Sequence, residues 1–155
     1  MARILILGYG NPLRSDDGVG WHAAVQLFRS IAVPEVEVLP CHQLTPDLAE
    51  PVSRAERVLF LDGARSAPGG EFHCEEVLAS EGSPSFTHHL SPTLLLAIAR
   101  DLYGAYPRAW LLTIGGNTFD AGEALSPEVE TALRALKARV RELIAETIGD
   151  FAAAR

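Results

Sequence analysis

Cysteine is scarce in this chain of 155 residues, and long apolar runs are missing. The two cysteines, Cys41 and Cys74, form neither a CxxC pair nor a disulfide framework, so we expect a reducing compartment. The apolar run Ile4-Leu5-Ile6-Leu7 is far too short for a signal peptide or a membrane span. We therefore expect a cytoplasmic protein with no membrane span.

Basic side chains are also in deficit. The 13 Lys and Arg residues face 20 Asp and Glu residues, which gives a formal net charge of −7. This balance argues against binding of a nucleic-acid backbone, which requires clustered Lys and Arg.

No HExxH motif occurs, and no Ser–His–Asp or Cys–His arrangement stands out. The 48% of hydrophobic residues is ordinary for a globular protein and excludes disorder.

Segments with the pattern of buried strands alternate with segments of helical periodicity. This order is typical of an α/β fold with a mostly parallel, doubly wound sheet of about five strands flanked by helices. We expect one domain over residues 1–150 and a disordered C-terminal tail over 151–155. The predicted strands are 3–7, 35–39, 57–61, 108–114 and an edge strand at 70–77, and the predicted helices are 18–30, 45–52, 91–103 and 126–148.

Chemistry-bearing segments follow the predicted strands. In open α/β sheets, ligands bind beyond the carboxyl ends of the strands. Residues 8–20, 62–63 and 115–117 all leave strands at that edge, and Cys41-His42-Gln43 follows another strand there. We expect these segments to converge on one site, although they are far apart in the sequence.

A glycine-rich loop, GYGNPLRSDDGVG, follows the first strand at residues 8–20. Such a loop often binds a dinucleotide phosphate, but Leu13 stands where the third glycine of GxGxxG belongs. Asp16 and Asp17 would moreover repel a phosphate and could instead recruit a divalent cation. One of the two aspartates is expected to cap the following helix, and we assign that role to Asp16.

This loop resembles the GxGNxLxxD(D/E)xxG signature of hydrogenase maturation endopeptidases. The resemblance extends along nearly the whole chain and implies a phosphorylase/hydrolase-like fold. Members of that family remove a C-terminal extension from the large subunit of nickel–iron hydrogenase once nickel is installed. They bind a divalent metal through a loop acid, a strand-ending aspartate and a later histidine. On this resemblance, Asp17 and Asp62 are the two acids, and both are expected to be catalytic.

The histidine position departs from the family pattern. The best-known members place histidine directly after Ser-Pro, where this chain has Thr93, a poor metal ligand. The nitrogen ligand is therefore expected from His89 or, alternatively, His88, just before Ser91-Pro92. We favour His89, which is nearer the start of the helix, as the third catalytic residue.

Two carboxylates and one imidazole suit borderline divalent ions such as Ni²⁺, Zn²⁺, Mn²⁺ or Co²⁺. The resemblance implies nickel, that of the client protein, and no nucleotide. The partner would be the precursor of a nickel–iron hydrogenase large subunit. A non-catalytic metal- or client-binding module of the same fold is the main alternative. Peptidyl-tRNA hydrolase also opens with a Gly-Asn-Pro turn, as in Gly10-Asn11-Pro12, but the net charge is wrong for tRNA.

Overall fold

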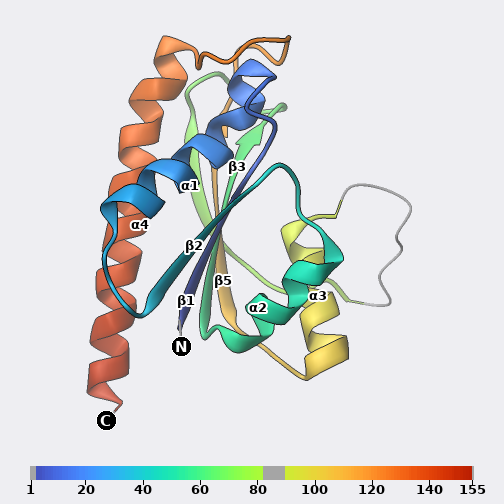
Figure 1. The fold of residues 1–155 in the computed structure, drawn as a ribbon, viewed down its shortest axis with the longest axis vertical. Helices are drawn as coiled ribbons and strands as arrows, with labels where there is room; N and C mark the ends of the chain where they lie inside the picture. Colours follow the sequence, from blue (N-terminus) through green and yellow to red (C-terminus); the bar gives the residue numbers. More distant parts are fainter. Residues whose placement is uncertain (1–2, 82–89, 155) are drawn as a thin grey trace.

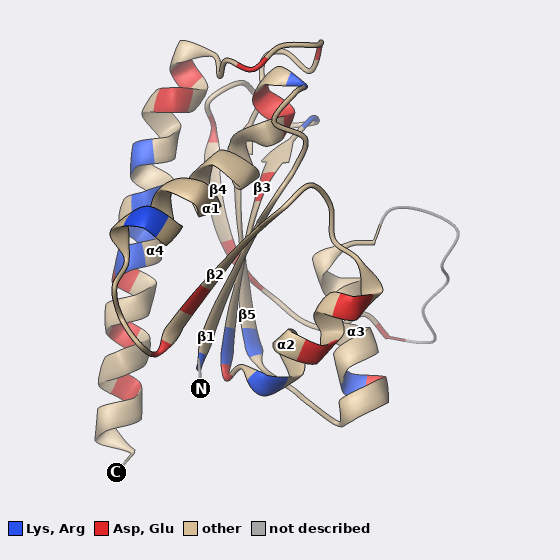
Figure 2. Cartoon of the chain, viewed as in Figure 1, with Lys and Arg blue, Asp and Glu red and all other residues tan. Residues whose placement is uncertain are grey.

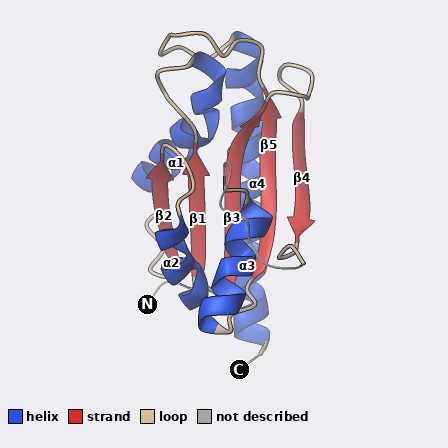
Figure 3. Cartoon of the chain, turned by 90° about the vertical axis from the view of Figure 1, so that its right-hand side faces the viewer, coloured by secondary structure: helices blue, strands red, loops and turns tan. Residues whose placement is uncertain are grey.

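The computed structural model describes residues 3–81 and 90–154. Five strands form one sheet in the order β2-β1-β3-β5-β4 (Figure 3). Four of them run parallel, and the edge strand β4 is antiparallel to β5. This confirms the predicted α/β class and strand number. The strands are β1 Ile4–Tyr9, β2 Val36–Cys41, β3 Arg57–Ala64, β4 Phe72–Val77 and β5 Arg108–Gly115.

Helices cover both faces of the sheet (Figure 1). Helices α1 (Val19–Ser30) and α4 (Pro127–Ala153) pack on one face, and α2 (Ala49–Arg54) and α3 (Pro92–Tyr103) on the other. Two short 3₁₀ turns, η1 (Ser15–Gly18) and η2 (Pro46–Leu48), precede α1 and α2.

The strand β1 shows why the sheet needs two helical layers. Its side chains alternate, so that Ile4 and Ile6 join the core under α1 and α4, whereas Leu5 and Leu7 join the core under α2 and α3. All four are essentially inaccessible to solvent. A strand that is apolar on both faces is the expected pattern for a covered parallel sheet.

The two helices expected to begin at Ser-Pro use their serines differently. The Ser91 hydroxyl caps α3 by accepting a hydrogen bond of 3.2 Å from the Leu94 backbone N–H. Ser126 precedes Pro127 at the start of α4 and has the same N-cap pattern, but its side chain makes no capping hydrogen bond. The Ser126 hydroxyl instead donates to Asp16 Oδ2 at 2.6 Å, a hydrogen bond to a charged acceptor.

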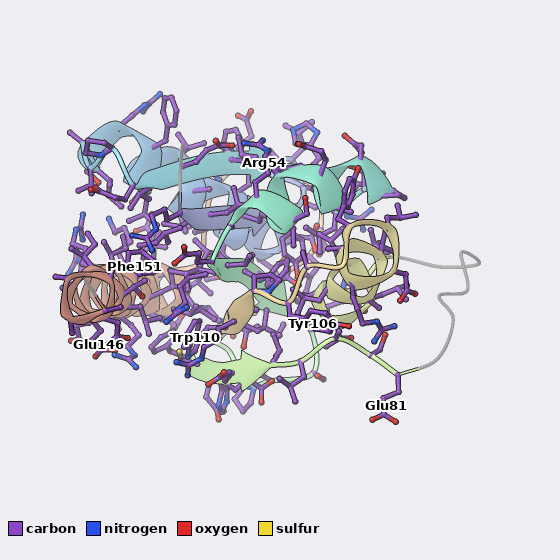
Figure 4. The ribbon with its side chains drawn as sticks, turned by 90° about the horizontal axis from the view of Figure 1, so that it is seen from below. Arg54, Glu81, Tyr106, Trp110, Glu146 and Phe151 are labelled. Carbon is purple, nitrogen blue, oxygen red and sulfur yellow. The ribbon has the colours of Figure 1, made fainter. Side chains whose placement is uncertain are left out.

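The C-terminal end of α4 differs from the sequence prediction. The helix continues to Ala153, past the domain end expected at residue 150, so most of the predicted tail is helical. The physical reason is Phe151, which is 8% exposed and packs into the core, with the Arg3 guanidinium 3.5 Å from its ring centroid. Figure 4, viewed from below, labels Phe151 on this helix, together with the exposed Glu146.

In the described part of the chain, no helix is both long and apolar enough to cross a membrane.

Candidate functional site

A pocket of about 1220 Å³ opens at the carboxyl edge of the sheet, where β1 and β3 end. Segments that are distant in the sequence meet there, as the pattern of strand ends predicted. The lining comes from the loop after β1 (Tyr9, Gly10, Asn11, Arg14, Asp17), the segment 42–46 after β2, Asp62 and Arg65 from the end of β3 and beyond, and residues 90–92 and Leu94 at the start of α3.

The loop after β1 holds Asp17 by its backbone. Gly10 has φ +140°, and a Cβ atom there would collide with the Asp17 carbonyl group. The Asn11 backbone N–H donates to Asp17 Oδ2 at 3.1 Å, while the Asn11 side chain accepts from the Leu13 N–H at 2.9 Å. The glycine therefore allows the close approach that fixes the Asp17 carboxylate at the pocket wall.

Asp16, the neighbour of Asp17, is fully buried and does not cap its own helix. Its Oδ1 accepts from the Ser126 N–H at 2.8 Å. Its Oδ2 accepts from the N–H groups of Asn117 and Thr118, at 2.8 and 3.1 Å, and from the Ser126 hydroxyl. Burial alone would raise the pKa of Asp16, but these hydrogen bonds hold it below its usual value. Asp16 thus ties the loop between β5 and α4 to η1, and the capping role expected for it is wrong.

Asp62 lies within β3, two residues before the last strand residue, Ala64, whereas the strand was expected to end at residue 61. Its Oδ1 accepts from the Gly63 N–H at 2.7 Å, and the Tyr9 hydroxyl donates to the same carboxyl group. Burial raises the pKa of Asp62 to about 7; the hydrogen bonds from Gly63 and Tyr9 oppose this shift, and the negative charge of Asp17 adds to it. Asp62 and Asp17 are therefore electrostatically coupled within one pocket.

Two arginines share this pocket with the aspartates, and Figure 2 shows basic and acidic segments together at this end of the sheet. Arg65 Nη2 lies 3.8 Å from Asp17 Oδ1, and its guanidinium carbon lies 4.3 Å from the centroid of the Phe119 ring. Arg14 Nε donates to the Phe119 carbonyl oxygen at 3.2 Å. Both arginines are thus held by one residue of the loop after β5.

The predicted site residues divide into three groups. Asp17 and Asp62 line one pocket, whereas His88 and His89 lie outside the described residues. Within 3–81 and 90–154, no three His, Cys, Asp or Glu side chains are grouped so that they could hold a metal ion. The segment 115–117, expected at the same edge, does not line the pocket and instead contacts Asp16 through Asn117.

Three pocket residues were missed by sequence reasoning: Tyr9, Arg14 and Arg65. The position of Tyr9 between two glycines at the end of β1 is a usable signal, because a large polar ring there must lie at the carboxyl edge. Arg65 has a weaker signal, its place three residues after Asp62. Arg14 had none beyond its membership of the loop.

The fold and this pocket together define a single-domain α/β protein with an acidic site at the carboxyl edge of its sheet. No family model matches the sequence, and no curated protein does. Solved structures do match, and many of them are hydrogenase maturation proteases.

One is the [NiFe] hydrogenase maturation protease HycI from Thermococcus kodakarensis, with 25% identity, a TM-score of 0.72, and coverage of 94% of this chain and 91% of that chain. The hydrogenase maturating endopeptidase HybD from E. coli has 24% identity, a TM-score of 0.75, and coverage of 94% and 93%. The hydrogenase 2 maturation peptidase from a Thaumarchaeota archaeon has 24% identity, a TM-score of 0.67, and coverage of 92% and 98%. The chain therefore has the fold of hydrogenase maturation proteases, and the resemblance indicated by its glycine-rich loop is confirmed at that level.

Proposed function

We propose that this protein is a cytoplasmic endopeptidase that removes the C-terminal extension from the nickel-loaded large subunit of a nickel–iron hydrogenase. One observation carries the proposal. Asp17 and Asp62, the two acids singled out by the loop and strand motifs, line one pocket in a fold shared with proteins named as hydrogenase maturation endopeptidases.

Asp17 and Asp62 would supply two ligands of a divalent cation, and the remaining protein ligand would come from outside the described residues. The negative charge of Asp17 helps to raise the pKa of Asp62, and a cation between the two carboxyl groups would relieve this repulsion. Asp17 Oδ2 and Asp62 Oδ1 each accept one backbone hydrogen bond, which orients both groups. In the proposal, Asp17 and Asp62 hold the metal, and His89 or His88 provides the nitrogen ligand. Leu90 and Ser91, the first described residues after them, line the same pocket, which supports that assignment.

When bound, nickel or another divalent ion would act as a docking point for the client, or as a Lewis acid on the scissile carbonyl group. The remaining roles belong to side chains of this chain. Tyr9 orients the Asp62 carboxyl group through its hydroxyl. Asp62, whose pKa is about 7, must release a proton before it can ligate, so binding should depend on pH near neutrality.

Processing of a precursor tests the proposal directly. A large-subunit precursor from the same organism, with and without nickel, would be incubated with the protein, and its shortening would be followed by mass spectrometry. Cleavage of the nickel-loaded form alone is expected. Asp17→Asn and Asp62→Asn should abolish it, and Asp150→Asn, on the distant and exposed end of α4, should not. Cleavage by both site variants at the rate of the parent would refute the proposed site.

A non-catalytic client-binding module of the same fold is the second candidate, and Thr93 favours it. The Thr93 hydroxyl lies 3.3 Å from the Ser91 hydroxyl at the start of α3, and Thr93 does not line the pocket. The position that bears the histidine in the best-known pattern is thus used for local structure. A module of this kind would bind the nickel-loaded precursor and leave its length unchanged.

A further inference from the structure

The positively charged side chain of Arg65 lies against Asp17, one of the two carboxylates that we propose to bind a metal ion. Its Nη2 is 3.8 Å from Asp17 Oδ1, and its side chain is 61% exposed. The Phe119 ring, 4.3 Å from the guanidinium carbon, supports it from another segment of the chain. The guanidinium is therefore held beside Asp17 without being buried there.

Arg14 provides the contrast within the same pocket. It carries the same charge and also lines the pocket, but its Nε donates to the Phe119 carbonyl oxygen. Its described contacts include no ion pair with either aspartate. Of these two pocket arginines, the structure pairs Arg65 with a proposed ligand.

We propose that Arg65 is the counter-ion of Asp17 in the metal-free protein and competes with divalent cations for that carboxylate. This inference rests on the proposed function. A guanidinium near Asp17 Oδ1 repels a dication and occupies part of its approach. Binding of a cation therefore requires Arg65 to swing away, which its exposure permits.

This competition would make the site discriminate between free metal ions and metal bound in a client protein. A free cation gains only the contacts of this chain, so the loss of the Arg65–Asp17 pair lowers its affinity without compensation. A metal that arrives inside a client protein also brings the contacts between the two proteins, and these offset the loss. Arg65 thus disfavours adventitious free metal and leaves the site open for metal that a client carries.

Metal titration tests this without any measurement of protease activity. Isothermal titration with Ni²⁺, and separately with Zn²⁺, would compare the parent with Arg65→Gln, Arg65→Lys and Arg14→Gln. Arg65→Gln should bind about three- to tenfold more tightly, the range expected for loss of a partly screened charge near a dication. Arg65→Lys, which keeps the charge, should bind as the parent does. Arg14→Gln, the matched control, should gain less than Arg65→Gln.

The dependence of metal affinity on ionic strength tests the same competition in a second way. The advantage of Arg65→Gln over the parent should shrink between 0.05 and 0.5 M ionic strength, roughly a threefold change in Debye length, because screening weakens the repulsion. A purely structural role for Arg65 would instead lower the affinity on substitution. Unchanged or weaker binding by Arg65→Gln would overturn the inference alone, provided that the parent binds metal and Asp17→Asn does not. Binding by Arg65→Gln but not by the parent would support the inference. If neither the parent nor Arg65→Gln binds either ion, the proposed metal site falls, and the inference falls with it.

Discussion

Replacement of Asp16 by asparagine would reveal how much of the fold depends on one buried carboxylate. Asp16 Oδ2 accepts three hydrogen bonds, from Asn117, Thr118 and Ser126, and Oδ1 accepts a fourth from the Ser126 N–H. An asparagine can keep its carbonyl oxygen at only one of these positions. The better arrangement retains the three bonds at Oδ2 and places the side-chain NH₂ against the Ser126 N–H, donor against donor.

The cost follows from this mismatch. One charge-assisted hydrogen bond is lost, at about 1.5–3 kcal/mol, and a buried N–H is left without an acceptor, at about 1–3 kcal/mol. These two costs overlap, so we expect Asp16→Asn to lower the free energy of unfolding by roughly 2–4 kcal/mol. A simple helix cap would behave differently, because asparagine caps as well as aspartate does.

Urea unfolding at pH 7, followed by circular dichroism, measures the difference, with Asp150→Asn as the exposed control. A loss below about 1 kcal/mol would refute the reasoning and restore the capping role. The pH dependence gives a further check. Because the pKa of Asp16 is lowered in the folded state, its contribution is present above the unfolded pKa of about 4 and is lost as the pH falls below it. The parent should therefore lose stability in acid more steeply than Asp16→Asn.

Other expected outcomes concern the pocket. Asp62→Asn should raise the free energy of unfolding at pH 8 by about 1–3 kcal/mol and have little effect at pH 4. The reason is that the pKa of Asp62 is raised in the folded protein, so the folded protein loses stability as the pH rises through about 7 and this carboxyl group ionises. Urea unfolding at both pH values measures the effect, and a lower free energy of unfolding for Asp62→Asn at pH 8 would contradict it. Tyr9→Phe should move the pKa of Asp62 further up by removing a hydrogen bond to its charged form, and a carboxyl NMR titration that shows a fall would count against that role. Ni²⁺ affinity should rise between pH 6 and pH 8 as Asp62 loses its proton, and a flat profile by titration calorimetry would exclude Asp62 as a ligand. His88→Ala and His89→Ala, titrated in parallel, should differ strongly in metal affinity; if both bind as tightly as the parent, neither is the nitrogen ligand.

The order of strands and helices followed from the sequence, because each element carries its own signal. Apolar runs such as the one in β1 bury both faces, and Ser91-Pro92 starts α3 through a local cap. The convergence of Asp17 and Asp62 was also predictable, since parallel strands end at a common edge.

The errors come from contacts that no local pattern records. Asp16 binds residues that are 101 to 110 positions away, so its short-range capping pattern predicted a wrong partner. Ser126 had the pattern of an N-cap but donates its hydroxyl to Asp16 for the same reason. The Arg65 guanidinium, which pairs with Asp17, also lies over the ring of Phe119, a residue of the loop after β5 that is far away in the sequence.

The adjacent aspartates also show how a backbone turn separates two identical side chains into different roles. Asp16 and Asp17 lie in η1, which Ser15 enters with φ +52°. Consecutive side chains of a 3₁₀ turn point about 120° apart, so the two carboxylates cannot face the same surroundings. Asp16 points into the protein, where four donors saturate it, and Asp17 lines the pocket with one backbone donor and an exposed arginine. Only the carboxylate with exchangeable partners can take up a cation without breaking the fold, which is the physical argument for assigning the proposed ligand role to Asp17.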